Sequence, residues 1–271
     1  MDCDAENIFL YMKDKIKLLD GNYYDKKELL DKMVDDEFYY GELNKLALSS
    51  SSLKLMLDSP KTYYYVTKYG QNKNTAALTA GWLFHTAILE PEKYADLKFI
   101  DVQSKNTKKF KLAKEEYGQV FTAKEESENN RLVDAFFKNP RAVELLNDSQ
   151  TEVSGITEIF GKPFRAKADV LKNKGGIVDL KTTVDVQNFN KSAYRYKYHL
   201  QVAIYCEAFN CSYKDFTFLC LDKANLDIGI WNVSEEFYEY GRKELKKGID
   251  LYDTYIREDF DINDYTIQGT L

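Results

Sequence analysis

The sequence has no long apolar run and few cysteines, and each shortage argues against a class of protein. No stretch of its 271 residues approaches the roughly 20 apolar residues of a membrane-spanning helix. The N-terminus begins Met-Asp-Cys-Asp-Ala-Glu and lacks the basic region of a signal peptide. We therefore expect neither membrane insertion nor secretion.

The cysteines are too scattered to form a recognisable metal site. They are Cys3, Cys206, Cys211 and Cys220, with no C-x-x-C pair. This spacing disfavours zinc or iron–sulfur ligation, and a chain of this length does not need disulfides to fold. We expect reduced thiols in a cytoplasmic protein without an iron–sulfur cluster.

Helical periodicity dominates the first half of the sequence. Several helices are marked by capping residues or by a following proline. The predicted helices are Ile8–Leu19, Lys26–Met33, a short one after Ser49 that ends before Pro60, Ala76–Leu89, one from Thr122 to Lys138, and one after Pro140. Residues 101–120 are lysine-rich and predict a loop with a short helix.

From Glu152 onward the sequence alternates apolar and polar residues, which predicts strands. The predicted strands are Glu152–Phe160, Phe164–Leu171, Ile177–Thr182, Phe216–Asp222 and Asp227–Val233, with helices at Tyr196–Phe209 and Glu235–Tyr255. Gly161-Lys162-Pro163 predicts a hairpin turn between the first two strands. The chain is therefore expected to be an α/β domain at residues 46–271 with a helical N-terminal extension at residues 1–45.

Two acids and a lysine lie on these predicted strands. Asp169 follows Ala168, while Asp179 and Lys181 alternate with apolar residues and so leave one face of their strand. Hard divalent cations bind carboxylates and retain water, and they polarise a phosphate and activate that water. A lysine can stabilise the charge that develops during hydrolysis. The pattern predicts a metal-dependent phosphodiesterase site, and a solvated strand end is the structural alternative.

The hairpin does not settle which further acid contributes to the site. With Gly161 and Lys162 at its tip, Asp169 is expected opposite Ser154. Glu152 and Glu158 then share a face, and a slip in register would change which acid approaches the site. We prefer Glu152, with Glu158 as the alternative.

The order of several separated motifs resembles the RecB-type branch of the PD-(D/E)xK nucleases. The motifs are Gly81-x-x-x-His85, Glu152, Asp169, Asp179-x-Lys181 and Gln201-x-x-x-Tyr205. Within that branch the chain is most similar to the nuclease domain of exonuclease VIII from phages and prophages, over about Leu46 to Val233. The resemblance also includes Ser51-Ser52-Leu53-Lys54 and Ser59-Pro60.

The resemblance implies a fold and a set of site residues. The fold is a restriction-endonuclease-like core, a central mixed sheet flanked by helices. His85, Asp169 and Asp179 are expected to bind metal and Lys181 to be catalytic. Glu152 occupies the position of the acid at the start of the family's hairpin. Gln201 and Tyr205 match the motif that follows the catalytic strands, and the resemblance adds them, with Asp169, Asp179 and Glu152, to the expected catalytic set. Ala168 replaces the proline of the superfamily name, and Asp179 replaces the more usual glutamate.

The resemblance also implies an activity. Family members degrade linear double-stranded DNA processively from 5′ ends with Mg²⁺, for which Mn²⁺ can substitute. They form ring-shaped homo-oligomers and work with a single-strand annealing protein in phage-type recombination. The expected location is the cytoplasm of a bacterial host, and no iron–sulfur cluster is expected.

The net charge of −6 argues against DNA binding by bulk charge and leaves room for a local basic groove. A ring would have an electropositive interior, and its candidate residues are Lys105, Lys108, Lys109, Lys111, Arg195 and Lys197. A solvated lysine-rich loop explains the same residues equally well.

Two other functions stay open at this point. One is a structure-specific or restriction-like endonuclease of the same fold, and the other is a non-catalytic DNA-binding or assembly protein. The complete set of two acids and a lysine favours an enzyme.

Overall fold

A five-stranded mixed sheet organises the computed structural model, which describes residues 14–70 and 75–270. Its strand order is β5-β6-β7-β8-β9, in which β7 and β8 are parallel and the other neighbours are antiparallel. The strands are β5 (Ser149–Ile159), β6 (Lys162–Lys172), β7 (Ile177–Thr183), β8 (Phe216–Asp222) and β9 (Ile228–Asn232). All five predicted strands are confirmed.

The turn of the β5–β6 hairpin differs from the predicted one. Its two loop residues are Phe160 and Gly161, both with positive φ (49° and 75°), as the twist of a two-residue hairpin requires. Lys162 and Pro163 instead belong to β6. This shift moves the register, so that Ser154 pairs with Lys167 and not with Asp169.

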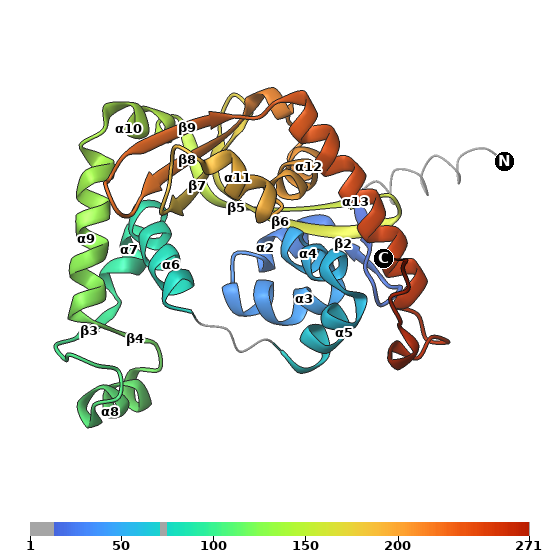
Figure 1. Cartoon of the computed structure of the whole chain (residues 1–271), viewed down its shortest axis with the longest axis horizontal. Coiled ribbons are helices and arrows are strands. Elements are labelled where there is room, and N and C mark those ends of the chain that lie inside the picture. Colours follow the sequence, from blue (N-terminus) through green and yellow to red (C-terminus); the bar gives the residue numbers. More distant parts are fainter. Residues whose placement is uncertain (1–13, 71–74, 271) are drawn as a thin grey trace.

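Helices cover both faces of the sheet (Figure 1). Successive residues of β7 point to opposite faces, since Ile177 joins the core cluster on one side and Val178 the cluster on the other. The first cluster packs against α4 (Ser50–Asp58), α12 (Tyr198–Ala208) and α13 (Glu235–Tyr255), and the second against α6 (Ala76–Leu89), α9 (Ala123–Phe137) and α10 (Pro140–Leu146).

The caps that were predicted from sequence form as expected. Ser49 accepts a hydrogen bond from the Ser52 amide at the start of α4, and Thr122 and Glu125 form a reciprocal capping box on α9. The helices that sequence patterns missed include α5 (Pro60–Tyr69), α7 (Pro91–Ala95) and α11 (Phe189–Arg195). The lysine-rich segment contains α8 (Lys108–Tyr117), as predicted, and is flanked by β3 (Lys98–Ile100) and β4 (Val120–Thr122).

The N-terminal segment is partly helical and packs on the β5–β6 hairpin. It contains β1 (Lys15–Lys17), β2 (Tyr23–Asp25), α2 (Lys26–Lys32), the π-helix η1 (Phe38–Glu42) and α3 (Leu43–Leu46). The helix expected at Ile8–Leu19 is wrong in its described part, where β1 pairs with β2; residues 8–13 lie outside the described residues. The apolar side chains of this segment form a cluster that includes Ile156 of β5.

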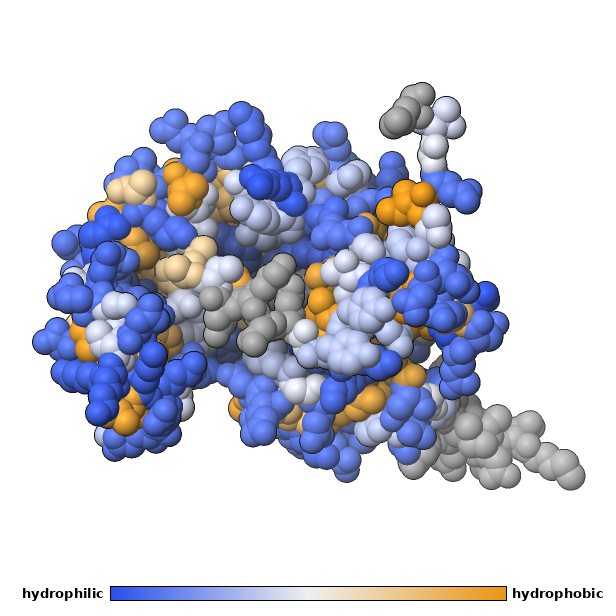
Figure 2. All heavy atoms as spheres, turned by 60° about the horizontal axis from the view of Figure 1, so that its bottom comes forward, coloured by the Kyte–Doolittle hydropathy of each residue, from blue (hydrophilic) through white to orange (hydrophobic). Residues whose placement is uncertain are grey.

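The surface is mostly hydrophilic on the face shown in Figure 2, with apolar side chains in small separate patches. Within residues 14–70 and 75–270, no helix combines the length and apolar character that a membrane crossing requires.

Close packing of α12 against α13 depends on one glycine. A Cβ added at Gly241 would lie 2.1 Å from the carbonyl oxygen of His199, so Gly241→Ala must push the helices apart. We expect it to lower the free energy of unfolding by about 2 kcal/mol in urea titrations. Gly41→Ala is the matched control, because nothing lies within 4 Å of its added Cβ. Equal stability of the two variants would contradict this packing.

Candidate active site

The site lies where β6 and β7 separate. Their backbone pairing covers only Val170 with Val178 and Leu171 with Ile177. Beyond it, the Leu180 amide donates to Oδ2 of Asp169 at 2.7 Å instead of to a backbone carbonyl. The Asp169 side chain thus fills the fork between the strands, which brings it beside the face that carries Asp179 and Lys181.

Asp179 is the most buried acid of the predicted set, with 0% relative exposure. One carboxylate oxygen pairs with the Lys181 ammonium. The other accepts a hydrogen bond from Nε2 of Gln201 on α12 at 2.6 Å. Because a buried carboxylate without partners is costly, these two contacts hold Asp179 in one orientation.

Despite these contacts, the site holds more negative than positive charge. Burial raises the pKa of Asp179 to about 6, and the neighbouring Asp169 carboxylate adds to the effect against the opposing charge of Lys181. Burial likewise raises the pKa of Asp169. Burial also disfavours the charged form of Lys181, but the Asp179 and Asp169 carboxylates outweigh it and raise the pKa of this ammonium. Lys181 therefore stays charged, while the two acids share one counter-ion.

His85 reaches the site from α6. Its Nδ1 lies 3.5 Å from Oδ2 of Asp169. Burial, followed by the charge of Lys181, lowers the pKa of His85 to about 4. The imidazole is therefore neutral at neutral pH, which is the form that can donate a lone pair to a metal.

The structure brings Glu152, not Glu158, next to Asp169. The flanking pairs Thr151–Val170 and Val153–Ala168 put Glu152 opposite Asp169, although Glu152 itself leaves the ladder with a φ of 52°. Burial raises the pKa of Glu152 to about 8, and the Asp169 and Glu90 carboxylates add to the shift. Glu158 is exposed and pairs with Pro163 near the hairpin tip.

Tyr205 lies beside Gln201 at the buried side of the site. It is buried one turn after Gln201 and packs against Phe209 and Phe216. Burial raises its pKa well above the ordinary value. The geometry gives Tyr205 a supporting role beneath Gln201.

Lys54 of α4 is a site residue to which sequence reasoning assigned no role. Its ammonium lies 5.2 Å from the centre of the Tyr198 ring, and that of Lys181 lies 5.0 Å from the same ring. Burial and then the charge of Lys181 lower the pKa of Lys54 to about 8. The sequence feature that could have identified Lys54 is its place in Ser51-Ser52-Leu53-Lys54, a motif of the resemblance.

The six candidate DNA-binding residues do not form one group. Lys197 begins α12 and faces Asp58 at 3.8 Å, near Lys54. Lys105 pairs with Glu125 at 2.6 Å, and α8 with its lysines lies at the far end of the molecule beyond β3 and β4 (Figure 1). The six residues therefore do not form one contiguous groove within a single chain.

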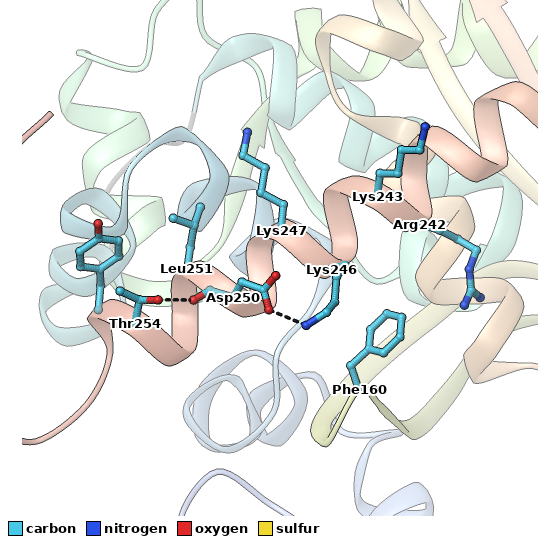
Figure 3. Close-up of a pocket in the computed structure, with 9 residues that line it drawn as sticks. Phe160, Arg242, Lys243, Lys246, Lys247, Asp250, Leu251 and Thr254 are labelled. Atoms are coloured by element: carbon cyan, nitrogen blue, oxygen red, sulfur yellow. Dashed lines mark hydrogen bonds and ion pairs between the residues drawn. The ribbon is translucent and has the colours of Figure 1, made fainter. Parts of the chain in front are cut away.

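One surface hollow among the described residues is separate from this site. It has a volume of about 580 Å³ and lies along the outer side of α13, where basic side chains and Phe160 line it (Figure 3). None of the predicted site residues contributes to it. The candidate chemistry therefore rests on the buried acids and not on the shape of a pocket.

The side chains at the fork fit a hard divalent cation in their chemistry. Asp169 and Asp179 offer carboxylate oxygens, and His85 offers a neutral imidazole. Their uncompensated negative charge favours a bound cation. Within the described ranges, no three His, Cys, Asp or Glu side chains already converge as a ready ligand set.

Glu152 makes stability depend on pH in metal-free protein. Because its folded pKa is raised to about 8 from 4.5, its stabilising protonated form is present at low pH and is lost as the pH rises through about 8. Glu152→Gln cannot ionise, so we expect it to exceed wild type in unfolding free energy at pH 8.5 by at least about 1 kcal/mol. The gain should vanish near pH 4.5 in urea titrations.

Glu158→Gln is the control for that comparison, because its side chain is exposed on the same strand. A pH-independent difference between Glu152→Gln and wild type would contradict the assigned environment.

Comparison with known proteins agrees with this architecture. The family model described as PDDEXK-like domain of unknown function (DUF3799) matches residues 49–261. The crystal structure of a protein described as a proposed exonuclease from Eubacterium rectale is similar at a TM-score of 0.62 with 16% identity, over 88% of this chain and 95% of that one.

A weaker match is the structure of SSO0001, with a TM-score of 0.30, 18% identity and coverage of 47% of this chain and 69% of that one. No curated protein sequence matches significantly. The fork, its two acids and lysine, and the match over residues 49–261 together place this chain in the PDDEXK-like family DUF3799.

Proposed function

We propose that this protein is a metal-dependent deoxyribonuclease. The observation that supports this proposal most strongly is the buried Asp179 and the partly buried Asp169 beside Lys181, at the fork of β6 and β7 in a PDDEXK-like fold. The finer proposal is a Mg²⁺-dependent, processive 5′→3′ exonuclease on linear duplex DNA, with Mn²⁺ as a substitute.

The wider setting is also proposed from the resemblance. We infer a ring-shaped homo-oligomer that acts with a single-strand annealing protein in phage-type recombination, in the cytoplasm of a bacterial host. The description of the Eubacterium rectale relative as a proposed exonuclease supports the choice of exonuclease over endonuclease.

Each residue has a defined task in the proposed reaction. Asp169, Asp179 and His85 would hold the cation, and Glu152 would add a fourth ligand or accept a proton. When bound, the cation supplies a polarised phosphate and an activated water. Lys181 stabilises the negative charge that develops on the phosphate oxygens. Gln201 fixes the Asp179 carboxylate, and Tyr205 supports Gln201 from the core.

The direct test is digestion of end-labelled linear duplex with Mg²⁺. We expect Asp179→Asn and Lys181→Met each to lower the rate by about a hundredfold or more, since each removes a charge from the site. Glu158→Gln should match wild type. Wild-type activity in Asp179→Asn would reject the assigned site.

Covalently closed circular DNA separates the candidate enzymes. An exonuclease leaves circles intact while it degrades the same DNA after linearisation, whereas an endonuclease nicks both. Absence of cleavage together with absence of Mg²⁺ or Mn²⁺ binding would favour a non-catalytic DNA-binding protein.

The basic residues predict a salt-dependent affinity for duplex DNA. Each phosphate contact contributes about −0.9 to the slope of log K against log salt. We expect the double variant Arg195→Gln, Lys197→Gln to lose about two such contacts in metal-free binding titrations.

The triple variant Lys108→Gln, Lys109→Gln, Lys111→Gln tests α8 separately and is expected to lose about three. Lys124→Gln on α9, whose side chain is 79% exposed, is the control and should keep the wild-type slope. A wild-type slope in either multiple variant would remove that group from the proposed DNA path.

A further inference from the structure

The N-terminal segment contacts the candidate site through one acid. Asp36 lies between α2 and η1, and its two carboxylate oxygens hold two lysines from different parts of the chain. Oδ1 lies 2.7 Å from the ammonium of Lys167 on β6, and Oδ2 lies 2.6 Å from that of Lys93 on α7. Lys93 also reaches Glu90 at 3.1 Å.

Lys167 leaves β6 next to the proposed ligands. It is two residues before Asp169, so both side chains leave the same face of the strand. Its partner across the hairpin is Ser154, which makes Glu152 a diagonal neighbour. A lysine side chain is long enough to reach a diagonal neighbour in an antiparallel pair. Without another partner, Lys167 would therefore pair with Glu152.

In the structure Lys167 forms its ion pair with Asp36 and none with Glu152. Its side chain is only 10% exposed and is held between Asp36 and the rings of Tyr39 and Tyr40, at 4.6 and 5.4 Å from the ring centres. Glu152 forms no ion pair with any lysine or arginine of the described chain. The acid beside Asp169 is thus left without a direct ion-pair partner among the described residues, although the charge of Lys167 still acts on it.

The rest of the segment holds Asp36 in place. Arg165 lies over the Tyr39 ring at 4.5 Å and donates to Asn44 at 2.5 Å. Ser154 donates to the Met33 carbonyl at 3.2 Å. The π-helix η1, an arrangement found frequently at functional sites, carries Tyr39 and Tyr40.

We propose that Asp36 is a positioning residue, which keeps Lys167 from an ion pair with Glu152 so that this carboxylate is free for a divalent cation. The inference rests on the proposed metal-dependent function. It gives the N-terminal segment a task, because the segment then completes the electrostatics of a site whose ligands all lie elsewhere.

The test is calorimetric titration of the full chain with Mn²⁺ in the absence of DNA. Asp36→Asn keeps the shape of the side chain and removes its charge, so Lys167 becomes free to pair with Glu152. We expect Mn²⁺ affinity to fall about tenfold, a typical cost of losing an outer-shell partner. Asp31→Asn, at an exposed surface pair with Lys27, is the control and should leave the affinity unchanged.

A second variant separates charge from structure. Asp36→Asn combined with Lys167→Met removes the competing lysine, so the affinity should return to within about twofold of wild type. A merely structural role of Asp36 predicts the opposite, because the double variant would bind no better than Asp36→Asn. Thermal melting of both variants checks that they are folded.

Wild-type affinity in Asp36→Asn, or no recovery in the double variant, overturns the inference. In either case the proposed function still stands if wild type binds Mn²⁺ and Asp179→Asn does not. Absence of Mn²⁺ binding by wild type would overturn both proposals.

Discussion

The buried contact between Asp179 and Lys181 is the constraint on which the site depends. A carboxylate with no exposed surface would destabilise the fold unless it were paired. Lys181 and Gln201 supply the partners from β7 and α12. The pairing leaves the site two positive charges short once the carboxylates of Asp169 and Glu152 are counted. We interpret this shortage as the physical reason why the site would bind a cation.

The sheet makes this arrangement possible by separating two strands. Antiparallel pairing of β6 and β7 lasts for two residue pairs and then gives way to a side-chain contact from Asp169. On the other side of β6, Glu152 leaves the ladder in a left-handed conformation. Departures from regular pairing are costly and cluster at functional sites, and here two of them flank the same aspartate.

Much of the fold followed from local patterns in the sequence. The strands were visible because apolar residues recur along each of them at strand spacing, and α6 was predicted with its observed ends, Ala76 and Leu89. The hairpin register was not predictable, since either Phe160-Gly161 or Gly161-Lys162 could form the turn. The one-residue shift of the turn places Asp169 opposite Glu152 instead of opposite Ser154. Side-chain alternation alone could not reveal this, because the shift keeps every residue on its own face.

The residues of the site that come from distant segments were harder to predict. Lys54 and Asp36 belong to helices or turns more than a hundred residues before β6, and their roles depend on tertiary contacts. The most direct test of the central claim is anomalous scattering from a crystal grown with Mn²⁺. We predict a peak within about 2.5 Å of carboxylate oxygens of both Asp169 and Asp179. A peak elsewhere, with Asp179 still bonded only to Lys181 and Gln201, would contradict it.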